Sequence, residues 1–175
     1  MIKKLIATVS VLAGLFNPAI AGNTIEDHRN IIRSLERVGV QVQINPPHCE
    51  LGFDGVYNSY YQTVNICQDH KDSDYVMVPW TDNDLDTLRH EAHHVVQDCL
   101  AEKRGDDKLT TLFEGKEYVS FVINGLPSEV IERIEEEYKK NGASSHVIEV
   151  EREAFAVAFN VEASSIAKAI INVCE

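Results

Sequence analysis

Residues 81–100 read TDNDLDTLRHEAHHVVQDCL, and this stretch decides the fold. Thr81 is followed three residues later by Asp84, which is the pattern of a capping box at the start of a helix. The apolar residues that follow recur at helical spacing, and Gly105 provides a stop. The sequence therefore predicts one helix from this cap to about Lys103.

His90, Glu91 and His94 form an H-E-x-x-H pattern inside that helix. Residues four apart lie on one helical face, so both histidines can direct a ring nitrogen at one metal ion. Glu91 is then turned toward the open coordination position, where it can accept a proton from the attacking water. We therefore expect one Zn²⁺ per chain, with Glu91 as the catalytic residue. His93 is expected to pack at the rim of the site.

A catalytic zinc ion needs a third protein ligand. The residues after His94 lack the G-x-x-H continuation that would supply it, so it must come from elsewhere in the chain. The best segment is 149–158, EVEREAFAVA, whose helical phase places Glu151 beside the apolar face. A carboxylate at a buried face needs a cation, so Glu151 is favoured. Glu153, on the opposite margin, and Glu149, toward solvent, are the alternatives.

At these residues the sequence resembles the gluzincin group of zinc metallopeptidases. In that group a later helix supplies a glutamate ligand in an E-x-E-A setting, and residues 151–154, EREA, look like that signature. The resemblance implies a zincin-like α+β fold and hydrolysis of peptide bonds in a peptide or protein substrate. Many members place Asp or Asn next, to hold a zinc-binding histidine. Phe155 stands there instead, so Asp98, Asn160 or a backbone carbonyl would take that role.

The same resemblance implies a donor that stabilises the developing oxyanion. Tyr118, Tyr138 and His146 are the candidates for that role. Two other functions stay open, namely a zinc amidase acting on cell-wall peptides and a non-catalytic zinc-binding or inhibitory module. Glu91 favours catalysis over the module, because metal binding alone has no use for a glutamate at that position.

The N-terminus has the composition of an export signal. Lys3 and Lys4 precede a mostly apolar run over residues 5–16, and residues 19–21, AIA, give a small-x-small cleavage pattern. We expect residues 1–21 to be a signal peptide and residues 22–175 to form a single domain that is secreted or periplasmic. A formal net charge of −12 argues against nucleic acid and anionic membranes as partners.

Four cysteines in an exported chain predict two disulfides. Of the three pairings, we favour Cys49–Cys67, which closes a local hairpin, and Cys99–Cys174, which ties the last helix to the central one.

The remaining pattern predicts an α+β fold with a small N-terminal sheet followed by a bundle of helices. Thr24 opens a first helix with another capping box, and Gly39 ends it. The other expected elements are a strand over 40–44, one or two strands of a hairpin over 55–67, a short strand or extended segment over 75–80, helices over 108–122 and 127–141, and one long or two shorter helices over 145–174.

Overall fold

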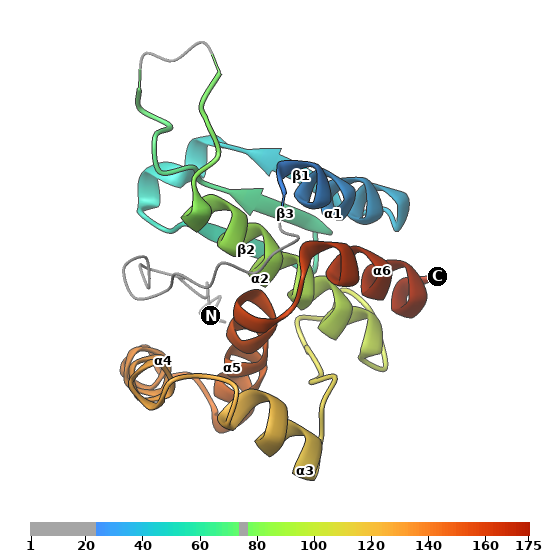
Figure 1. Ribbon diagram of the computed structural model, residues 1–175, viewed down its shortest axis with the longest axis vertical. Coiled ribbons are helices and arrows are strands. Elements are labelled where there is room, and N and C mark those ends of the chain that lie inside the picture. Colours follow the sequence, from blue (N-terminus) through green and yellow to red (C-terminus); the bar gives the residue numbers. More distant parts are fainter. Residues whose placement is uncertain (1–23, 74–76) are drawn as a thin grey trace.

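The computed structural model describes residues 24–73 and 77–175, and the predicted signal peptide lies outside these residues. These residues form an α+β architecture, with a three-stranded sheet and six α-helices (Figure 1). The elements in chain order are α1 (Ile25–Arg37), β1 (Gln41–Ile44), η1 (Pro47–Leu51), β2 (Gly55–Asn58), β3 (Thr63–Ile66), α2 (Asp82–Leu100), α3 (Gly115–Tyr118), η2 (Val119–Ile123), α4 (Ser128–Lys140), α5 (Ser145–Asn160) and α6 (Ala163–Cys174).

The sheet has the strand order β1-β3-β2, in which β1 runs parallel and β2 antiparallel to β3. The predicted hairpin over 55–67 is therefore confirmed. Because side chains alternate along a strand, Val64 and Ile66 are buried in the main core, whereas Thr63 and Asn65 line a groove on the other face. The sheet thus has one face on the helices and one face away from them.

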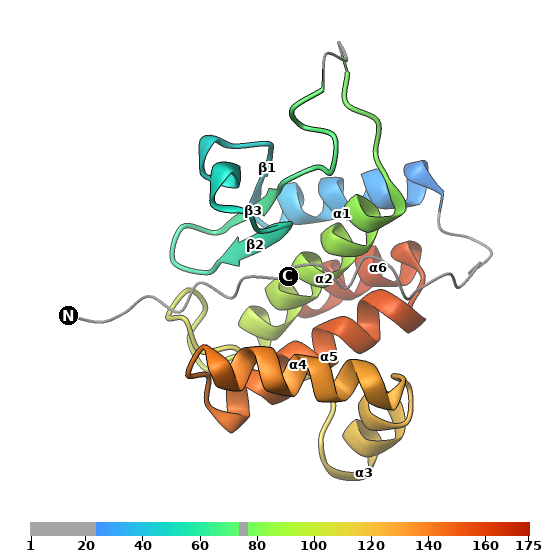
Figure 2. The ribbon, with the colours of Figure 1, turned by 90° about the vertical axis from the view of Figure 1, so that its left-hand side faces the viewer.

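Helix α2 is the centre of the molecule, and it contacts α1, α5, α6, β2 and β3 (Figures 1 and 2). Its apolar residues, Leu88, Ala92, Val95 and Val96 among them, join the main core. A second apolar cluster holds α4 against α5 and η2. This arrangement places α2 and α5 side by side, and these are the two helices that carry the predicted metal ligands.

Both predicted capping boxes are present, at Thr24 with Asp27 and at Thr81 with Asp84. Residues 145–174, predicted as one long or two shorter helices, form the two helices α5 and α6. Helix α2 ends at Leu100, slightly before the predicted end.

The structure departs from the predicted elements at two places. The helix expected over 108–122 begins only at Gly115, because the N–H groups of Leu112 and Phe113 donate to the Glu153 carboxylate instead of to helical carbonyls. Of the two alternatives for residues 75–80, the strand does not form over 77–80, and residues 75 and 76 lie outside the described part of the chain.

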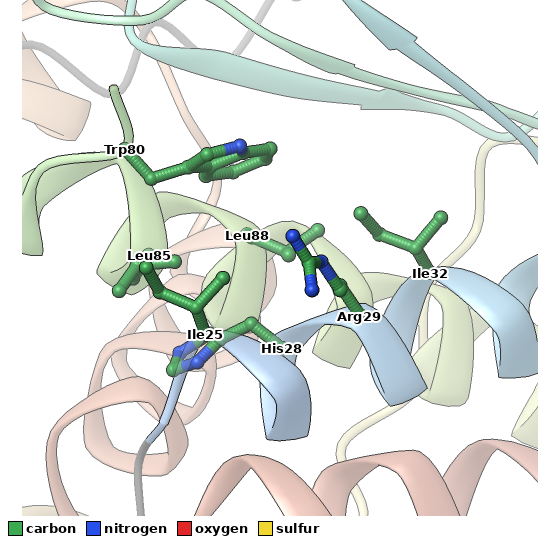
Figure 3. A pocket seen from close by; sticks show the side chains of 7 residues that line it. All are labelled: Ile25, His28, Arg29, Ile32, Trp80, Leu85 and Leu88. Atoms are coloured by element: carbon green, nitrogen blue, oxygen red, sulfur yellow. The ribbon is translucent and has the colours of Figure 1, made fainter.

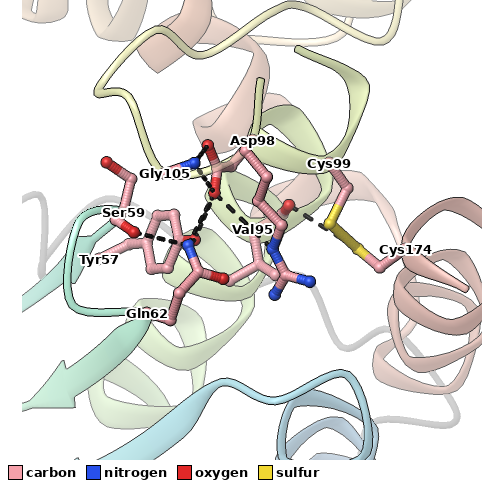
Figure 4. Close-up of a disulfide and its surroundings, with 9 residues drawn as sticks. Tyr57, Ser59, Gln62, Val95, Asp98, Cys99, Gly105 and Cys174 are labelled. Atoms are coloured by element: carbon pink, nitrogen blue, oxygen red, sulfur yellow. Dashed lines mark hydrogen bonds and ion pairs between the residues drawn. A yellow bond between two sulfur atoms is a disulfide. The ribbon is translucent and has the colours of Figure 1, made fainter. Parts of the chain in front are cut away.

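Both predicted disulfides are confirmed, Cys49–Cys67 and Cys99–Cys174. The second joins the end of α2 to the end of α6 (Figure 4). Two disulfides fit an oxidising compartment. Among the described residues, no helix is long and apolar enough to cross a membrane.

A buried histidine joins α1 to α2 beside a small cavity of about 150 Å³ (Figure 3). His28 Nδ1 donates to the Thr24 carbonyl at 2.8 Å, and Nε2 accepts from Arg89 Nη1 at 2.8 Å. Arg89 Nε in turn donates to the Ala158 carbonyl at 2.9 Å. Burial lowers the pKa of His28, because the protonated ring would lose its hydration in the interior, and the Arg89 guanidinium lowers it further by charge repulsion.

This contact predicts acid sensitivity of folding. The folded state binds fewer protons at His28 than the unfolded state, so its contribution to stability is lost as pH falls below the ordinary histidine value of 6.5. We expect the free energy of unfolding to fall less between neutral and mildly acidic pH in His28→Gln than in the wild type. Urea unfolding at a series of pH values measures the difference. The exposed His70→Gln should follow the wild type, and equal pH slopes in all three proteins would contradict this role.

Candidate metal centre

Helix α2 places His90 and His94 one turn apart on the side that faces α5. Both side chains are buried, and their Nε2 atoms lie 3.0 Å apart. Two ring nitrogens directed at one point in the interior need a shared proton or a cation between them. The spacing predicted from the sequence is therefore realised in the structure.

Glu151 reaches the same point from α5. Its Oε2 atom lies 3.3 Å from His90 Nε2 and 3.5 Å from His94 Nε2. Tetrahedral donors with metal bonds of about 2.0–2.2 Å lie about 3.3–3.6 Å from one another, so this triangle of atoms is close to the size that zinc requires. His90, His94 and Glu151 are thus a group that could hold a metal ion.

The electrostatics of the group favour a cation. Burial lowers the pKa of His90 to about 4. Burial also opposes the charged form of His94, but the Glu151 carboxylate raises the pKa of that ring to about 9. Desolvation alone would raise the pKa of Glu151, yet His94 and His90 bring it below its usual range. A negative carboxylate is therefore held in the interior opposite a place for one positive charge.

Glu91 lies beside this group with one oxygen bound and the other without a partner. Its Oε2 accepts the backbone N–H of Tyr57 at 2.7 Å, whereas Oε1 is buried with no hydrogen bond to the described residues. Burial raises the pKa of Glu91 to about 7. Gly55 makes the approach of β2 possible, because a Cβ there would lie 2.4 Å from Thr87 Cγ2 and 3.0 Å from Glu91 Cγ.

Of the three residues proposed as oxyanion donors, Tyr138 is the one that reaches the centre. Tyr138 lies on α4, and its hydroxyl donates to Glu151 Oε2 at 2.7 Å. The Tyr118 hydroxyl donates to the Glu149 carbonyl at 3.1 Å. His146 is exposed, and its Nε2 lies 2.8 Å from the Leu109 carbonyl oxygen. Neither of the other two candidates contacts the group.

Gln97 orients His94, whereas the sequence had favoured Asp98, Asn160 or a backbone carbonyl for this role. Gln97 Oε1 lies 2.7 Å from His94 Nδ1, and its Nε2 donates to the Val150 carbonyl at 3.0 Å. Asp98 instead accepts from the Tyr57 hydroxyl at 2.8 Å, beside the disulfide in Figure 4. Asn160 donates to the Gly125 and Ala156 carbonyls. The three-residue spacing from His94 to Gln97, which puts both on one face of α2, is the sequence signal that indicates this contact.

His93 does not lie at the rim, as expected, but is buried between α2 and α5. Its Nε2 lies 2.8 Å from Glu153 Oε1. Glu153 is fully buried and also accepts from Gln97 Nε2 at 3.0 Å and from the backbone of Leu112 and Phe113. Its oxygens are occupied by donors away from the metal group. Glu149 is exposed, as predicted.

Comparison with known proteins gives no match to a protein-family model, to a curated protein or to a solved structure.

The first test of the centre concerns its third ligand. We expect Glu151→Ala to lose bound zinc, because it removes one of the three donor atoms, while Glu153→Ala keeps it. Elemental analysis after zinc loading and desalting measures the content per chain. The exposed Glu149→Ala is the matched control. Zinc retention in Glu151→Ala together with its loss in Glu153→Ala would reverse the assignment.

The second test concerns Gln97. Gln97→Met keeps the size of the side chain but removes the acceptor for His94 Nδ1, so the ring loses its fixed orientation. Loss of such a partner costs about 10–100-fold in metal affinity. Competition with a chromophoric zinc chelator measures this change. Gln68→Met, at another buried glutamine, should leave affinity unchanged, and equal affinity in both variants would rule out an orienting role.

Proposed function

We propose that this protein is a secreted zinc-dependent hydrolase, most simply a metallopeptidase of the gluzincin type with a zincin-like fold. One observation carries the proposal: the free carboxylate oxygen of Glu91 lies beside a buried group of two imidazoles and a carboxylate. A binding site needs the three donors alone. The glutamate adds a proton acceptor, which hydrolysis requires.

The donor set favours zinc. Imidazole nitrogen and carboxylate oxygen suit this ion, and two histidines with one glutamate are a known catalytic set that leaves a fourth position open. When bound, zinc would supply the Lewis acidity that activates water for attack near neutral pH. His90, His94 and Glu151 would hold the ion, and Gln97 would fix the ring of His94.

Glu91 is suited to move a proton. Burial raises the pKa of Glu91 to about 7 without the metal, and a zinc ion close by would lower it, so the two effects oppose each other at a carboxyl group that must accept a proton and return it. The Tyr57 N–H holds Oε2, so Oε1 is the oxygen that would take the proton from water and deliver it to the leaving nitrogen. This division of the two oxygens keeps the reactive one in a fixed orientation.

Tyr138 is the donor that we propose for the negative charge developing on the substrate carbonyl. Its hydroxyl already lies within hydrogen-bond distance of the centre, where it donates to Glu151. A preorganised donor in a water-excluded site is an effective stabiliser of such charge. To act in this way, Tyr138 must exchange its carboxylate partner for the substrate oxygen.

The centre is closed, and this bears on how a substrate would enter. His90, Glu91, His94 and Glu151 are all buried, and α4 contributes Tyr138 to their cover. We therefore propose that a peptide reaches the centre by displacing the Tyr138 hydroxyl from Glu151, while the apolar cluster that includes Ile134 and Ile148 keeps α4 packed against α5.

An amidase acting on cell-wall peptides would use the same centre, since the reaction at the carbonyl carbon is the same. The localisation proposed here rests on the signal-like residues 1–21 together with the two disulfides.

Glu91→Gln tests the proposal. Glutamine keeps the size and the hydrogen bond to Tyr57 but cannot accept a proton, so zinc content should stay unchanged while hydrolysis falls by about 10²–10⁴-fold. Turnover is measured on a mixed peptide library and on solubilised cell-wall fragments. His90→Ala should lose zinc and activity together, and Glu149→Gln should lose neither. Near wild-type turnover in Glu91→Gln would refute this mechanism.

A further inference from the structure

The face of the sheet that points away from the helices carries a groove of about 540 Å³. Two rows of side chains cross its floor in register. One row joins Gln41, Thr63 and Asn58, and the other joins Gln43, Asn65 and Val56. The remaining lining residues are His48, Leu51, Phe53 and Tyr61. Ligand pockets in proteins span about 300–1,000 Å³, so the groove has the size of a small-molecule site.

The floor is polar but uncharged. Among the described residues that line the groove, none is Asp, Glu, Lys or Arg, although such residues make up 25% of the chain. Amide side chains dominate instead, and each amide offers both donors and an acceptor. A surface of this kind suits a neutral ligand rich in groups that donate and accept hydrogen bonds, and it gives no counter-charge to an ionic one.

Asn65 shows that the hydrogen-bonding groups of the floor are not all paired within the protein. Its side chain is 4% exposed, and Oδ1 has no hydrogen-bond partner among the described residues. Its Nδ2 lies 3.5 Å from the Val56 carbonyl oxygen, at the limit of a hydrogen bond. A buried amide left in this state costs free energy that a ligand hydroxyl in the groove would recover.

The rim adds apolar and aromatic surface. The Tyr61 side chain is 62% exposed and Leu51 is 69% exposed. Phe53 is itself buried, and its ring lies against the half-buried ring of His48, with centroids 5.6 Å apart. Sugar rings combine hydroxyl edges with apolar C–H faces, and aromatic rings beside polar amides match both surfaces.

We infer that this groove is a binding site for a neutral glycan, with a short run of uncharged sugar rings lying across Gln43, Asn65 and Asn58 and against Tyr61. The site lies on the face of β2 and β3 opposite the metal centre, and it does not depend on the proposed hydrolytic function. An extended peptide is a poorer fit, because strand addition uses backbone groups at a sheet edge, whereas this floor presents side chains.

The test uses the purified protein and two neutral tetrasaccharides, one of glucose and one of N-acetylglucosamine. Calorimetric titration gives affinity, and the ¹H–¹⁵N spectrum of the Asn65 side-chain amide reports the site. We expect at least one tetrasaccharide to bind and to shift that amide. The two probes distinguish a plain hexose from an acetamido sugar.

Gln43→Glu places a charge on the exposed edge of the floor and removes the amide donor. Loss of roughly one hydrogen bond to the glycan should lower the affinity by about tenfold or more. Asn172→Asp makes a matched change on the exposed surface of α6 and should leave affinity unchanged. Asn65→Leu and Tyr61→Ala should also weaken binding, and Gln43→Glu carries the test if Asn65→Leu does not fold.

Three results would overturn the inference. One is the absence of binding by either tetrasaccharide at millimolar concentration. Another is unchanged affinity in Gln43→Glu. The third is equal binding of a heparin tetrasaccharide or of an uncharged peptide. Glu91→Gln and chelator-treated protein should bind the glycan as the wild type does, so failure of the catalytic proposal and failure of this one give different results.

Discussion

The buried carboxylate of Glu151, held between His90 and His94, is the constraint on which the rest of the structure depends. An isolated ionised carboxylate in a protein interior is very costly, so this one requires a positive partner on α2. That requirement fixes how α2 and α5 lie against each other. It also explains why the most buried helix of the fold is the one that carries charged and polar residues on its inner face.

A second buried carboxylate of α5, Glu153, also finds its partners on α2. It accepts from His93 and Gln97 on α2 and from the backbone of residues 112 and 113. Gln97 also contacts His94, so one glutamine connects the metal group to the segment before α3. In a low-dielectric interior such networks are strong when every member is satisfied. The contacts of Glu153 with His93 and Gln97 therefore favour one register of α5 against α2.

The capping boxes and the hairpin depend on spacing along one helix or strand, and local signals in the sequence predicted them. The two disulfides followed from four cysteines in a chain with an export signal, and the meeting of Glu151 with His90 and His94 followed from the H-E-x-x-H pattern together with the helical phase of residues 149–158. The sequence did not predict where the remaining buried polar groups find their partners. Glu153 takes the N–H groups of Leu112 and Phe113, which prevents a helix there. Helical phase alone placed His93 at a rim, whereas α5 covers that side of α2.

Strand β2 connects the two proposed sites. Because its side chains alternate, Gly55 and the backbone of Tyr57 meet Glu91 on one side, while Val56 and Asn58 line the groove on the other. A substrate that carried sugars and a peptide together could occupy the groove and pass the edge of β2 toward the metal centre. A cell-wall fragment has that composition, whereas an ordinary polypeptide does not. If the groove binds a neutral glycan, an amidase that acts on glycan-linked peptides would therefore fit this protein better than a general peptidase.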